Sequence, residues 1–370
     1  MAVKFLKLSG SSFDIGYQHG AGARQEIQSA YEYYMTFWST GSSSSEKTIL
    51  HTAMSFLPFL DQRLLEELEG VAAGSELELA KIIALNCRWE LNYAYMPDMQ
   101  GWLGAGCTAF ALTPEITRNH HTYLGQNWDY KLPLQEQCII LSIQQENRPS
   151  LILITEAGII GHKGFSSSGI AIAVNFIRLT KDTSRPGTPF LMKMRQILEQ
   201  PTLDECIRFL ERNPGPNSGN VLIACRDGRA VDAELNPQSM SVIHPDKGIL
   251  VHSNHFQRPP KGEKDVGCTA LPDTFARTKQ LYWHLSHCRA NSDAEAIEIG
   301  LRDHAGFPDS ICRHQNTSIP PENHWETLLS FYFDINAQEL KLTIGPPCHS
   351  SYISIQGFDD PIFKQAAEKG

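Results

Sequence analysis

The sequence contains no run of about eighteen or more apolar residues, so we expect no membrane-spanning helix. Basic residues are in the minority, with 32 Lys and Arg against 41 Asp and Glu and a formal net charge of −9. Binding to nucleic acid phosphates requires a basic face, so nucleic acid is not an expected partner. An internal repeat is also missing, which argues against a solenoid or propeller.

Targeting signals are missing at both ends. Residues 1–9 have neither a long apolar core nor a secretory cleavage site. Residues 366–370 do not form a peroxisomal signal of the Ser-Lys-Leu type. We therefore expect a cytoplasmic location.

The nine cysteines include no C-x-x-C pair, and their number is odd. Several lie in apolar runs, as Cys138 and Cys225 do. This usage is typical of a reducing compartment, with cysteines as core residues rather than as a disulfide framework.

Metal and dinucleotide motifs are absent as well. The pairs His120/His121 and His252/His255 lack the cysteine or carboxylate spacing that accompanies a metal site. The glycines of residues 158–169 are too loosely spaced for a dinucleotide-binding loop. We expect no metal and no redox cofactor.

The 370 residues are 41% hydrophobic, enough for one large domain or two. Residues 1–106 have a mostly helical pattern, with a Gly/Ser break at 41–45 and an exposed, mobile linker at 96–106. A capping box that begins at Ser75 opens the last of these helices. Helices are expected over residues 13–37, 61–73 and 75–91.

From Cys107 onward the pattern changes to strand-like runs separated by pairs of helices, which favours an α+β layered architecture. Strands are expected at 107–113, 122–128, 138–144, 150–155, 169–176, 220–225, 230–235, 240–244, 249–253, 328–335, 339–344 and 352–355. Further helices are expected at 188–199, 202–212, 271–287 and 292–303.

Cys107 follows the segment Gly104-Ala105-Gly106 and begins an alternating strand. A cysteine in such a place is most often a small buried hydrophobic residue. The alternative is that the chain is cut before Cys107. Its α-amine, with an ordinary pKa of roughly 7.7–8.0, would then act as general base for its own thiol. Gly106 has no Cβ, which lets the backbone expose its carbonyl to the thiol.

Other polar residues stand where strands end. Asp129 closes the strand expected to pair with 107–113, so its carboxylate would lie near the amine of Cys107; the alternative is an ordinary turn residue. Asn254 also follows a strand, where its amide would donate to a developing oxyanion unless it is only a strand-end asparagine. Arg313 lies in a polar loop.

Short motifs extend over nearly the whole chain. They are Ile15-Gly-Tyr-x-His-Gly20, Gly106-Cys-Thr108, Gly125-Gln-Asn-Trp-Asp129, Ile154-Thr-Glu-Ala-Gly-Ile-Ile-Gly161, Gly164-Phe-x-Ser-x-Gly169, Val251-His-x-Asn-His255 and Ser310-Ile-Cys-Arg313. In this order they resemble the fungal isopenicillin N acyltransferase (acyl-CoA:6-aminopenicillanic acid acyltransferase) family. That family, of peptidase C45 type, belongs to the N-terminal-nucleophile hydrolases.

The resemblance implies a four-layer αββα sandwich of the N-terminal-nucleophile type. It also implies a precursor cut between Gly106 and Cys107. The products would be a mostly helical α subunit, 1–106, and a catalytic β subunit, 107–370. The two would form one integrated domain, an α/β heterodimer. Its implied catalytic residues are Cys107, Asp129, Asn254 and Arg313.

The resemblance also points to supporting or substrate-binding residues. Ser310 falls in the family's active-site loop, and Thr108 follows the nucleophile. More distant relatives, the penicillin V acylases and bile salt hydrolases, have an arginine where Gln126 or Asn127 stands here. Asn175 lies near a substrate-side asparagine of that group.

The implied activity is acyl transfer from an amide or an acyl-CoA thioester, through acyl-Cys107, to an amine or to water, as part of specialised metabolism. Acyl-CoA would be a co-substrate, and no other cofactor is required. The sequence departs from the penicillin enzyme at Ala109, where that enzyme has a hydroxyl, which concerns the substrate more than the chemistry. Alternatives are an amide hydrolase of the β-alanyl-amine or N-acyl-amine type and an unprocessed, non-catalytic paralogue.

The segment Gly267-Cys268-Thr269 repeats the triplet at Cys107. It precedes a helical pattern rather than an alternating strand, and a cut there would remove most of the expected sheet. We therefore expect no cleavage at Cys268.

Overall fold

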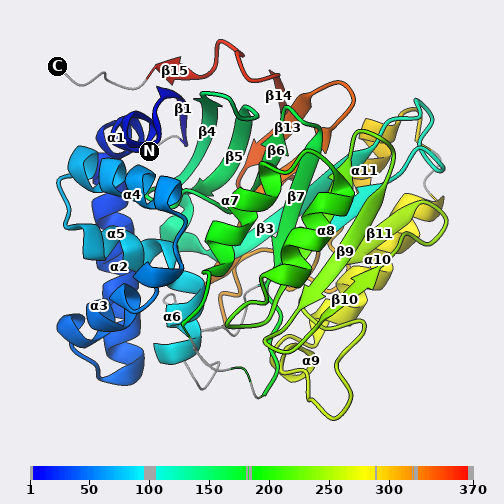
Figure 1. Cartoon of the computed structure of the whole chain (residues 1–370). Coiled ribbons are helices and arrows are strands. Elements are labelled where there is room, and N and C mark those ends of the chain that lie inside the picture. Colours follow the sequence, from blue (N-terminus) through cyan, green and yellow to red (C-terminus); the bar gives the residue numbers. More distant parts are fainter. Residues whose placement is uncertain are drawn as a thin grey trace.

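The computed structural model describes residues 3–95, 106–180, 182, 186–287, 290–318, 320 and 324–365. Two β-sheets lie at the centre of the molecule, with helices on the outside (Figure 1). The linker expected at 96–106 lies outside the described residues except for Gly106.

The larger sheet has nine strands in the order β10-β9-β8-β7-β6-β5-β4-β1-β15. Their bounds are Met240–Ile243, Ala230–Leu235, Gly219–Cys225, Ile170–Asn175, Lys163–Ser166, Leu151–Glu156, Cys138–Gln145, Lys4–Gly10 and Lys364–Gln365. The smaller sheet has six strands in the order β11-β2-β3-β12-β13-β14. Their bounds are Ile249–His252, Cys107–Leu112, Tyr123–Lys131, Trp325–Asp334, Glu339–Ile344 and Ile353–Gln356.

The described α-helices all lie between β1 and β12 in the chain. Helices α1 to α6 span Ser12–Gly22, Arg24–Ser42, Glu46–Met54, Gln62–Ser75, Leu79–Asn86 and Arg88–Tyr95. Helices α7 to α11 span Phe190–Leu198, Leu203–Arg212, Gly267–Ala270, Asp273–His287 and Asp293–Leu301. Short 3-10 turns, η1 and η3, span Leu57–Phe59 and Leu132–Gln137.

The layers follow from the contacts between these elements. Helices α1, α7 and α8 pack on strands of the larger sheet, while α10 packs on β11 of the smaller sheet and contacts α11 (Figure 1). The sheets contact one another through β2 and β3 on one side and β7 and β8 on the other. The expected four-layer αββα sandwich is confirmed.

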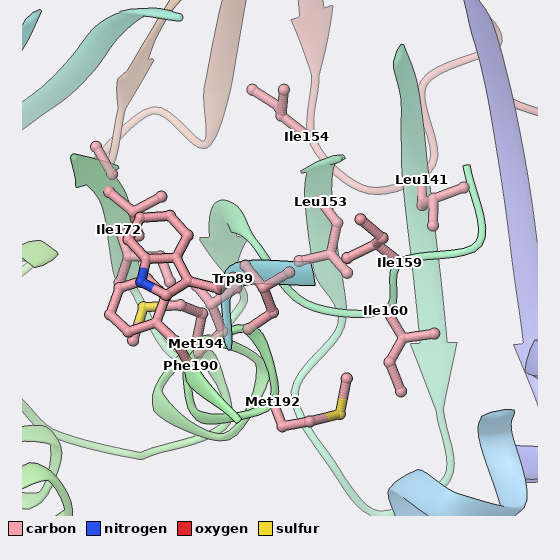
Figure 2. Close-up of a cluster of buried hydrophobic side chains, with 14 of the residues drawn as sticks. Trp89, Leu141, Leu153, Ile154, Ile159, Ile160, Ile172, Phe190, Met192 and Met194 are labelled. Atoms are coloured by element: carbon pink, nitrogen blue, oxygen red, sulfur yellow. The ribbon is translucent and has the colours of Figure 1, made fainter. Parts of the chain in front are cut away.

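The strands of the interior are buried on both faces, because each sheet has the other sheet on one side and helices on the other. Strands β4, β5, β7 and β8 accordingly read as nearly continuous apolar runs, and most of their residues are buried. Figure 2 shows part of this core, where Trp89 stacks on Phe190 with ring centroids 4.3 Å apart. Leu153 and Ile172 of the larger sheet belong to the same cluster.

The N-terminal segment differs from the expected pattern in several places, among them the unexpected helix α3 and a break at Cys87 that divides the helix expected over 75–91 into α5 and α6. Strand β1 was not expected; it pairs in parallel with β4, and its other edge pairs with β15. The helix expected over 13–37 is divided at Ala23, whose φ of −126° is not helical. The strand is part of the larger sheet, so the N-terminal segment is more than a helical cover.

The capping box expected at Ser75 is wrong. Ser75 ends α4, and Glu76 follows in the left-handed conformation with a φ of 60°. The next helix, α5, begins only at Leu79. The Gly74-Ser75 segment is therefore a helix C-terminus that resembles a helix start in sequence.

Helices α1 and α4 approach so closely that glycine is required on both. A Cβ on Gly16 would lie 1.9 Å from the carbonyl oxygen of Glu67, and one on Gly20 would lie 2.4 Å from that of Val71. Glycines 70 and 74 of α4 face α1 in the same way. This contact gives the first motif, Ile15-Gly-Tyr-x-His-Gly20, a packing role.

The histidine of that motif is also buried. Nε2 of His19 accepts a hydrogen bond from the backbone N–H of Gly158 at 3.0 Å. Burial, with a smaller effect from Arg195, lowers the pKa of His19 to about 3, so the ring is neutral. Two motifs far apart in sequence are thus joined by a structural contact.

No helix in the described ranges combines the length and the apolar composition needed to cross a membrane.

Candidate active site

The candidate site forms at the N-terminal end of β2, where this strand lies between β3 and β11. Cys107 is opposite Trp128 in the antiparallel register, as the expected hairpin requires. The carbonyl of Gly106 accepts a hydrogen bond from the backbone N–H of Asp129 at 2.9 Å. The backbone N–H of Cys107 donates to Oδ1 of Asn254 at 2.9 Å. The Gly106–Cys107 peptide is therefore held on both sides.

Arg277 of α10 connects these groups. Its Nη1 donates to the carbonyl of Cys107 and to Oγ1 of Thr108, both at 2.8 Å. Its Nη2 donates to Oδ1 of Asn254 at 2.9 Å, and its Nε donates to Asp273 at 2.7 Å. A buried guanidinium of fixed planar shape thus sets the position of the first residues of β2 relative to Asn254.

Asn254 has a different orientation from the one an oxyanion donor requires. Its Oδ1 accepts from Cys107 and Arg277, and its Nδ2 donates to the carbonyl of Phe176 at 3.0 Å. In the continuous chain the asparagine therefore holds the nitrogen of Cys107. Its oxyanion role stays a prediction.

Asp129 is buried beside Gly106. Its Oδ1 accepts from the hydroxyl of Thr327 at 2.6 Å, and its Oδ2 lies 3.5 Å from Nε of Arg313. Burial raises the pKa of the Asp129 carboxyl to about 7, while the nearby Arg313 and Arg277 oppose this shift.

Arg313 lies directly against the predicted cleavage point. A Cβ built on Gly106 would lie 2.9 Å from both Nε and Nη2 of Arg313, so a side chain at this position would displace the guanidinium. Arg313 is also paired with Asp273 at 2.5 Å and with Asp309. The carboxylate of Asp273 thereby contacts both Arg277 and Arg313.

Lys163 adds an amine to the surroundings of Cys107. Its Nζ lies 3.5 Å from the centroid of the Trp128 ring, and both Lys163 and Cys107 line the same small cavity. Burial lowers the pKa of Lys163 to about 7, although the nearby Cys107 opposes this shift. Burial raises the pKa of the Cys107 thiol to about 11, and Lys163 opposes that shift in turn. At neutral pH the resting thiol is therefore protonated.

Three residues that the sequence predicts to support the site contact either Arg277 or the loop that carries Arg313. Thr108 contacts Arg277. Asn127 donates to the carbonyls of Leu301 and Ile311, which attaches β3 to the loop before Arg313. The hydroxyl of Ser310 donates to the carbonyl of Cys312 at 2.6 Å and so shapes the same loop.

Asn175 belongs to a polar chain between the sheets. Its Oδ1 accepts from Gln126 at 2.9 Å, and its Nδ2 contacts Asn220 at 3.0 Å and His252 at 3.2 Å. This chain lies next to the candidate site on β3 and β11, but no contact joins Asn175 to Cys107.

The cavity beside Cys107 measures about 30 Å³, enough for one or two water molecules. Gly106, Asp129 and Asn254 also line it. A larger groove of about 410 Å³ lies elsewhere, over β11 and α10 near Trp283. We assign the candidate site to the smaller cavity, because it contains Cys107, the predicted nucleophile, and the larger groove does not.

Sequence reasoning did not find Arg277, Asp273 or Lys163. Arg277 and Asp273 lie four residues apart in a helix, a spacing typical of an exposed ion pair. Lys163 stands in a short strand between glycines. Arg277 and Lys163 are distinguished only by their burial, and Asp273 only by its contacts with Arg277 and Arg313. No local pattern in the sequence reports either.

The second Gly-Cys-Thr triplet is in a different setting. Cys268 lies in the short helix α9, and its thiol donates to Asp265 at 3.2 Å. Burial and the Asp265 carboxylate raise the pKa of the Cys268 thiol to about 12. At neutral pH this thiol is therefore protonated and donates its hydrogen bond to the Asp265 carboxylate.

Comparison of the sequence with known proteins gives a matching family and similar proteins. A sequence model of the family described as acyl-coenzyme A:6-aminopenicillanic acid acyl-transferase matches residues 116–348. The chain is 27% identical over 368 residues to the acyl-coenzyme A:6-aminopenicillanic-acid-acyltransferase 40 kDa form of Emericella nidulans, covering 97% of each protein. An uncharacterised protein of Archaeoglobus fulgidus is 22% identical over 217 residues, 52% of this chain and 36% of that protein.

Solved structures show weaker likeness. A mutant conjugated bile acid hydrolase from Clostridium perfringens aligns with a TM-score of 0.46 and 12% identity, over 70% of this chain and 94% of that one. Penicillin V acylase from Agrobacterium tumefaciens aligns with a TM-score of 0.44 and 13% identity, over 70% of this chain and 88% of that one.

Proposed function

The chain belongs to the acyl-coenzyme A:6-aminopenicillanic acid acyl-transferase family, and from this premise we propose that it is a self-processing cysteine acyltransferase that cuts its own Gly106–Cys107 bond. Family membership confirms the predicted resemblance and the prediction of an enzyme that transfers acyl groups. The self-processing step and the specific chemistry are the proposal.

One observation carries the proposal: the Gly106–Cys107 peptide is surrounded by groups suited to acyl transfer. The Gly106 carbonyl accepts from a backbone N–H, the Cys107 nitrogen is held by Asn254, and Arg313 lies against Gly106. A peptide between structural residues does not require two buried arginines beside it, since each buried charge costs desolvation energy.

Self-cleavage begins with the thiol of Cys107 attacking the carbonyl carbon of Gly106. Lys163, which is largely neutral above pH 7, accepts the thiol proton. The backbone N–H of Asp129 stabilises the oxyanion that develops on Gly106. The C–N bond then breaks, and the nitrogen of Cys107 takes a proton and leaves as an amine.

The product of this step is a thioester between Gly106 and the sulfur of Cys107. A water molecule attacks the thioester carbonyl, which releases the Gly106 carboxylate and restores the thiol. Arg313 is placed to stabilise the negative charge of that carboxylate. The new α-amine of Cys107 takes over as the general base, because it is part of the same residue.

In the acyl-transfer reaction the substrate's acyl carbonyl occupies the position of the Gly106 carbonyl. The Cys107 thiol attacks it, its proton passes through the α-amine to the leaving group, and an acyl-Cys107 thioester forms. An amine or water then attacks this thioester. Asn254 and Arg277 keep the Cys107 amine in position, and Asp129 with Arg313 sets the charge of the site.

The proposed substrates are small molecules: an amide or acyl-CoA donor and an amine acceptor, as in specialised metabolism. The relative from Emericella nidulans carries acyl-coenzyme A and 6-aminopenicillanic acid in its name, which makes these the first compounds to assay. An amide hydrolase remains the second candidate, since it uses the same residues with water as acceptor. The processed enzyme would be an α/β heterodimer.

Intact mass and a denaturing gel test the self-cleavage. The wild-type chain of 41.4 kDa should yield two fragments that end at Gly106 and begin at Cys107. The Cys107→Ala variant should remain one chain and lose acyl transfer about a thousandfold or more. The matched Cys268→Ala variant should be cut and active. An active wild-type protein that remains a single chain would contradict the proposal.

Adding a free amine distinguishes the two candidate activities. For an acyltransferase, the amine should raise the turnover of acyl-Cys107 and appear in the product. For an amide hydrolase, turnover should not change, and the free acid should be the product.

A further inference from the structure

Four side chains that the candidate active site does not use converge on one point of the surface. They are His304, Cys312, His314 and Cys348, and their nitrogen and sulfur atoms all lie within 4.8 Å of one another. His304 is exposed, Cys312 is buried and the other two are half-buried. The group therefore has an open side through which a small ion can enter.

Three of the distances in this group, all measured from Nε2 of His314, have the size that a tetrahedral ion requires. Nε2 of His314 lies 3.1 Å from Nε2 of His304, 3.6 Å from Sγ of Cys312 and 3.4 Å from Sγ of Cys348. Ligands around Zn²⁺, with Zn–N of about 2.0–2.1 Å and Zn–S of about 2.3 Å, are roughly 3.3–3.8 Å apart. The three separations are within a few tenths of an ångström of that range.

Hydrogen bonding alone does not account for the arrangement. Nε2 of a histidine ring has either one proton or one lone pair, so it forms one good hydrogen bond. Nε2 of His314 faces three polar atoms at once. A cation at the centre satisfies all four ligand atoms together.

We propose that His304, Cys312, His314 and Cys348 bind one Zn²⁺ ion. Two thiolates and two imidazoles are a set that favours zinc over magnesium or calcium, and four protein ligands make a closed, structural site. On binding, Cys312 and Cys348 each release a thiol proton to solvent. No metal site was predicted from the sequence, because these ligands are spread over residues 304–348 without a compact motif.

The position of the site gives it a consequence for catalysis. Arg313 stands between Cys312 and His314, so the ion would fix the loop that carries this arginine. The loop is already attached through backbone contacts, from Cys312 N–H to the Asp303 carbonyl and from His314 N–H to the Pro308 carbonyl, both at 3.0 Å. Zinc would also connect this loop to Cys348, which lies beyond the end of β13.

Metal analysis of the purified full-length chain tests the site. The wild type should contain about one Zn²⁺ per chain. After Zn²⁺ is removed, added Co²⁺ should give the visible bands of a tetrahedral thiolate complex. The Cys348→Ser and His304→Ala variants should each bind the metal about a hundredfold more weakly or worse. The controls Cys268→Ser and His287→Ala should bind like the wild type.

Several outcomes would overturn the proposal. One is a reduced wild-type chain that retains no Zn²⁺ and gives no Co²⁺ spectrum; this measurement needs no variant and so does not depend on variant folding. Another is unchanged metal content in Cys348→Ser. A third is a disulfide between Cys312 and Cys348, detected as a loss of two hydrogens in intact mass and of alkylation at both residues.

Discussion

The peptide N–H of Cys107 donates to Oδ1 of Asn254 across 2.9 Å, which connects the first residue of β2 to the chain just beyond β11. The contact places a carbonyl-type acceptor at the nitrogen that the proposed cleavage would convert into an amine. An amine has N–H groups to donate to the same oxygen, so the contact is suited to both states of Cys107. Arg277 holds the same oxygen from the other side.

Replacing Arg277 by lysine should slow self-cleavage about a hundredfold, because lysine cannot form the planar, multiple contact to Cys107, Thr108 and Asn254. The measurement is the rate at which the single chain disappears, with thermal unfolding measured in parallel. Arg302→Lys, at a half-exposed arginine paired with Glu298, is the control and should be cut normally. An R277K chain cut at the wild-type rate would show that Arg277 does not position the peptide.

Self-cleavage should depend on pH through Lys163. Its pKa is lowered to about 7, so the amine is protonated and unable to accept a proton below that pH and becomes neutral above it. The cleavage rate should therefore rise as pH increases through about 7. Lys163→Met should lower the rate by about a hundredfold to ten-thousandfold.

Lys163→Arg is the informative companion to this variant, since arginine keeps the positive charge but does not lose its proton. It should be as slow as Lys163→Met, whereas Lys261→Met, at an exposed lysine, should match the wild type. A fast Lys163→Arg chain would mean that the charge of Lys163 matters and its basicity does not.

The close packing of α1 on α4 should make Gly16 intolerant of even one added methyl group. A Cβ there would lie 1.9 Å from the Glu67 carbonyl oxygen, so the helices must separate. Gly16→Ala should reduce the free energy of unfolding by about 3 kcal/mol, measured by urea denaturation. Gly41→Ala, at an exposed glycine in α2, should have no effect or stabilise slightly. Equal stability of the two variants would contradict the importance of this contact between α1 and α4.

The ion pair of Glu67 and Arg195 is a second test of the N-terminal packing. Both side chains are buried, and their two parallel contacts are each 2.9 Å long. Glu67→Gln replaces the carboxylate by a neutral amide, so the buried guanidinium of Arg195 loses this charged partner. The change should reduce the free energy of unfolding by about 3 kcal/mol. Glu66→Gln, one residue away on the exposed face of α4, should change stability by less than about 0.5 kcal/mol. A loss of similar size in both variants would show that the pair is not what stabilises α4.

The parts of the fold that local patterns define were predictable. Most interior strands are short apolar runs bounded by turn residues, and the hairpin of β2 with β3 follows from its position in the chain. Strand β1 was missed because its partner β4 is more than a hundred residues away. The alternation of Leu6, Lys7 and Leu8, of which the two leucines are buried, is a signal that could have indicated it.

The candidate site was predictable only where chemistry is visible in sequence. Cys107, Asp129 and Asn254 were noticed because each stands at the end of an expected strand, whereas the role of Arg313 required the family resemblance. Arg277 and Lys163 gave no such signal, because an arginine or lysine in sequence does not reveal that it will be buried. Their importance arises from the tertiary structure.

Strand β1 lies inside the larger sheet, between β4 and β15, and this position has a consequence for unfolding and refolding. A chain cut after Gly106 keeps this strand in the larger sheet, so the fragments would not separate while the protein is folded. Once unfolded, however, they would be two molecules, and refolding would become a bimolecular reaction that slows with dilution. We expect cleavage to convert a protein that refolds by itself into one whose loss of structure is effectively irreversible.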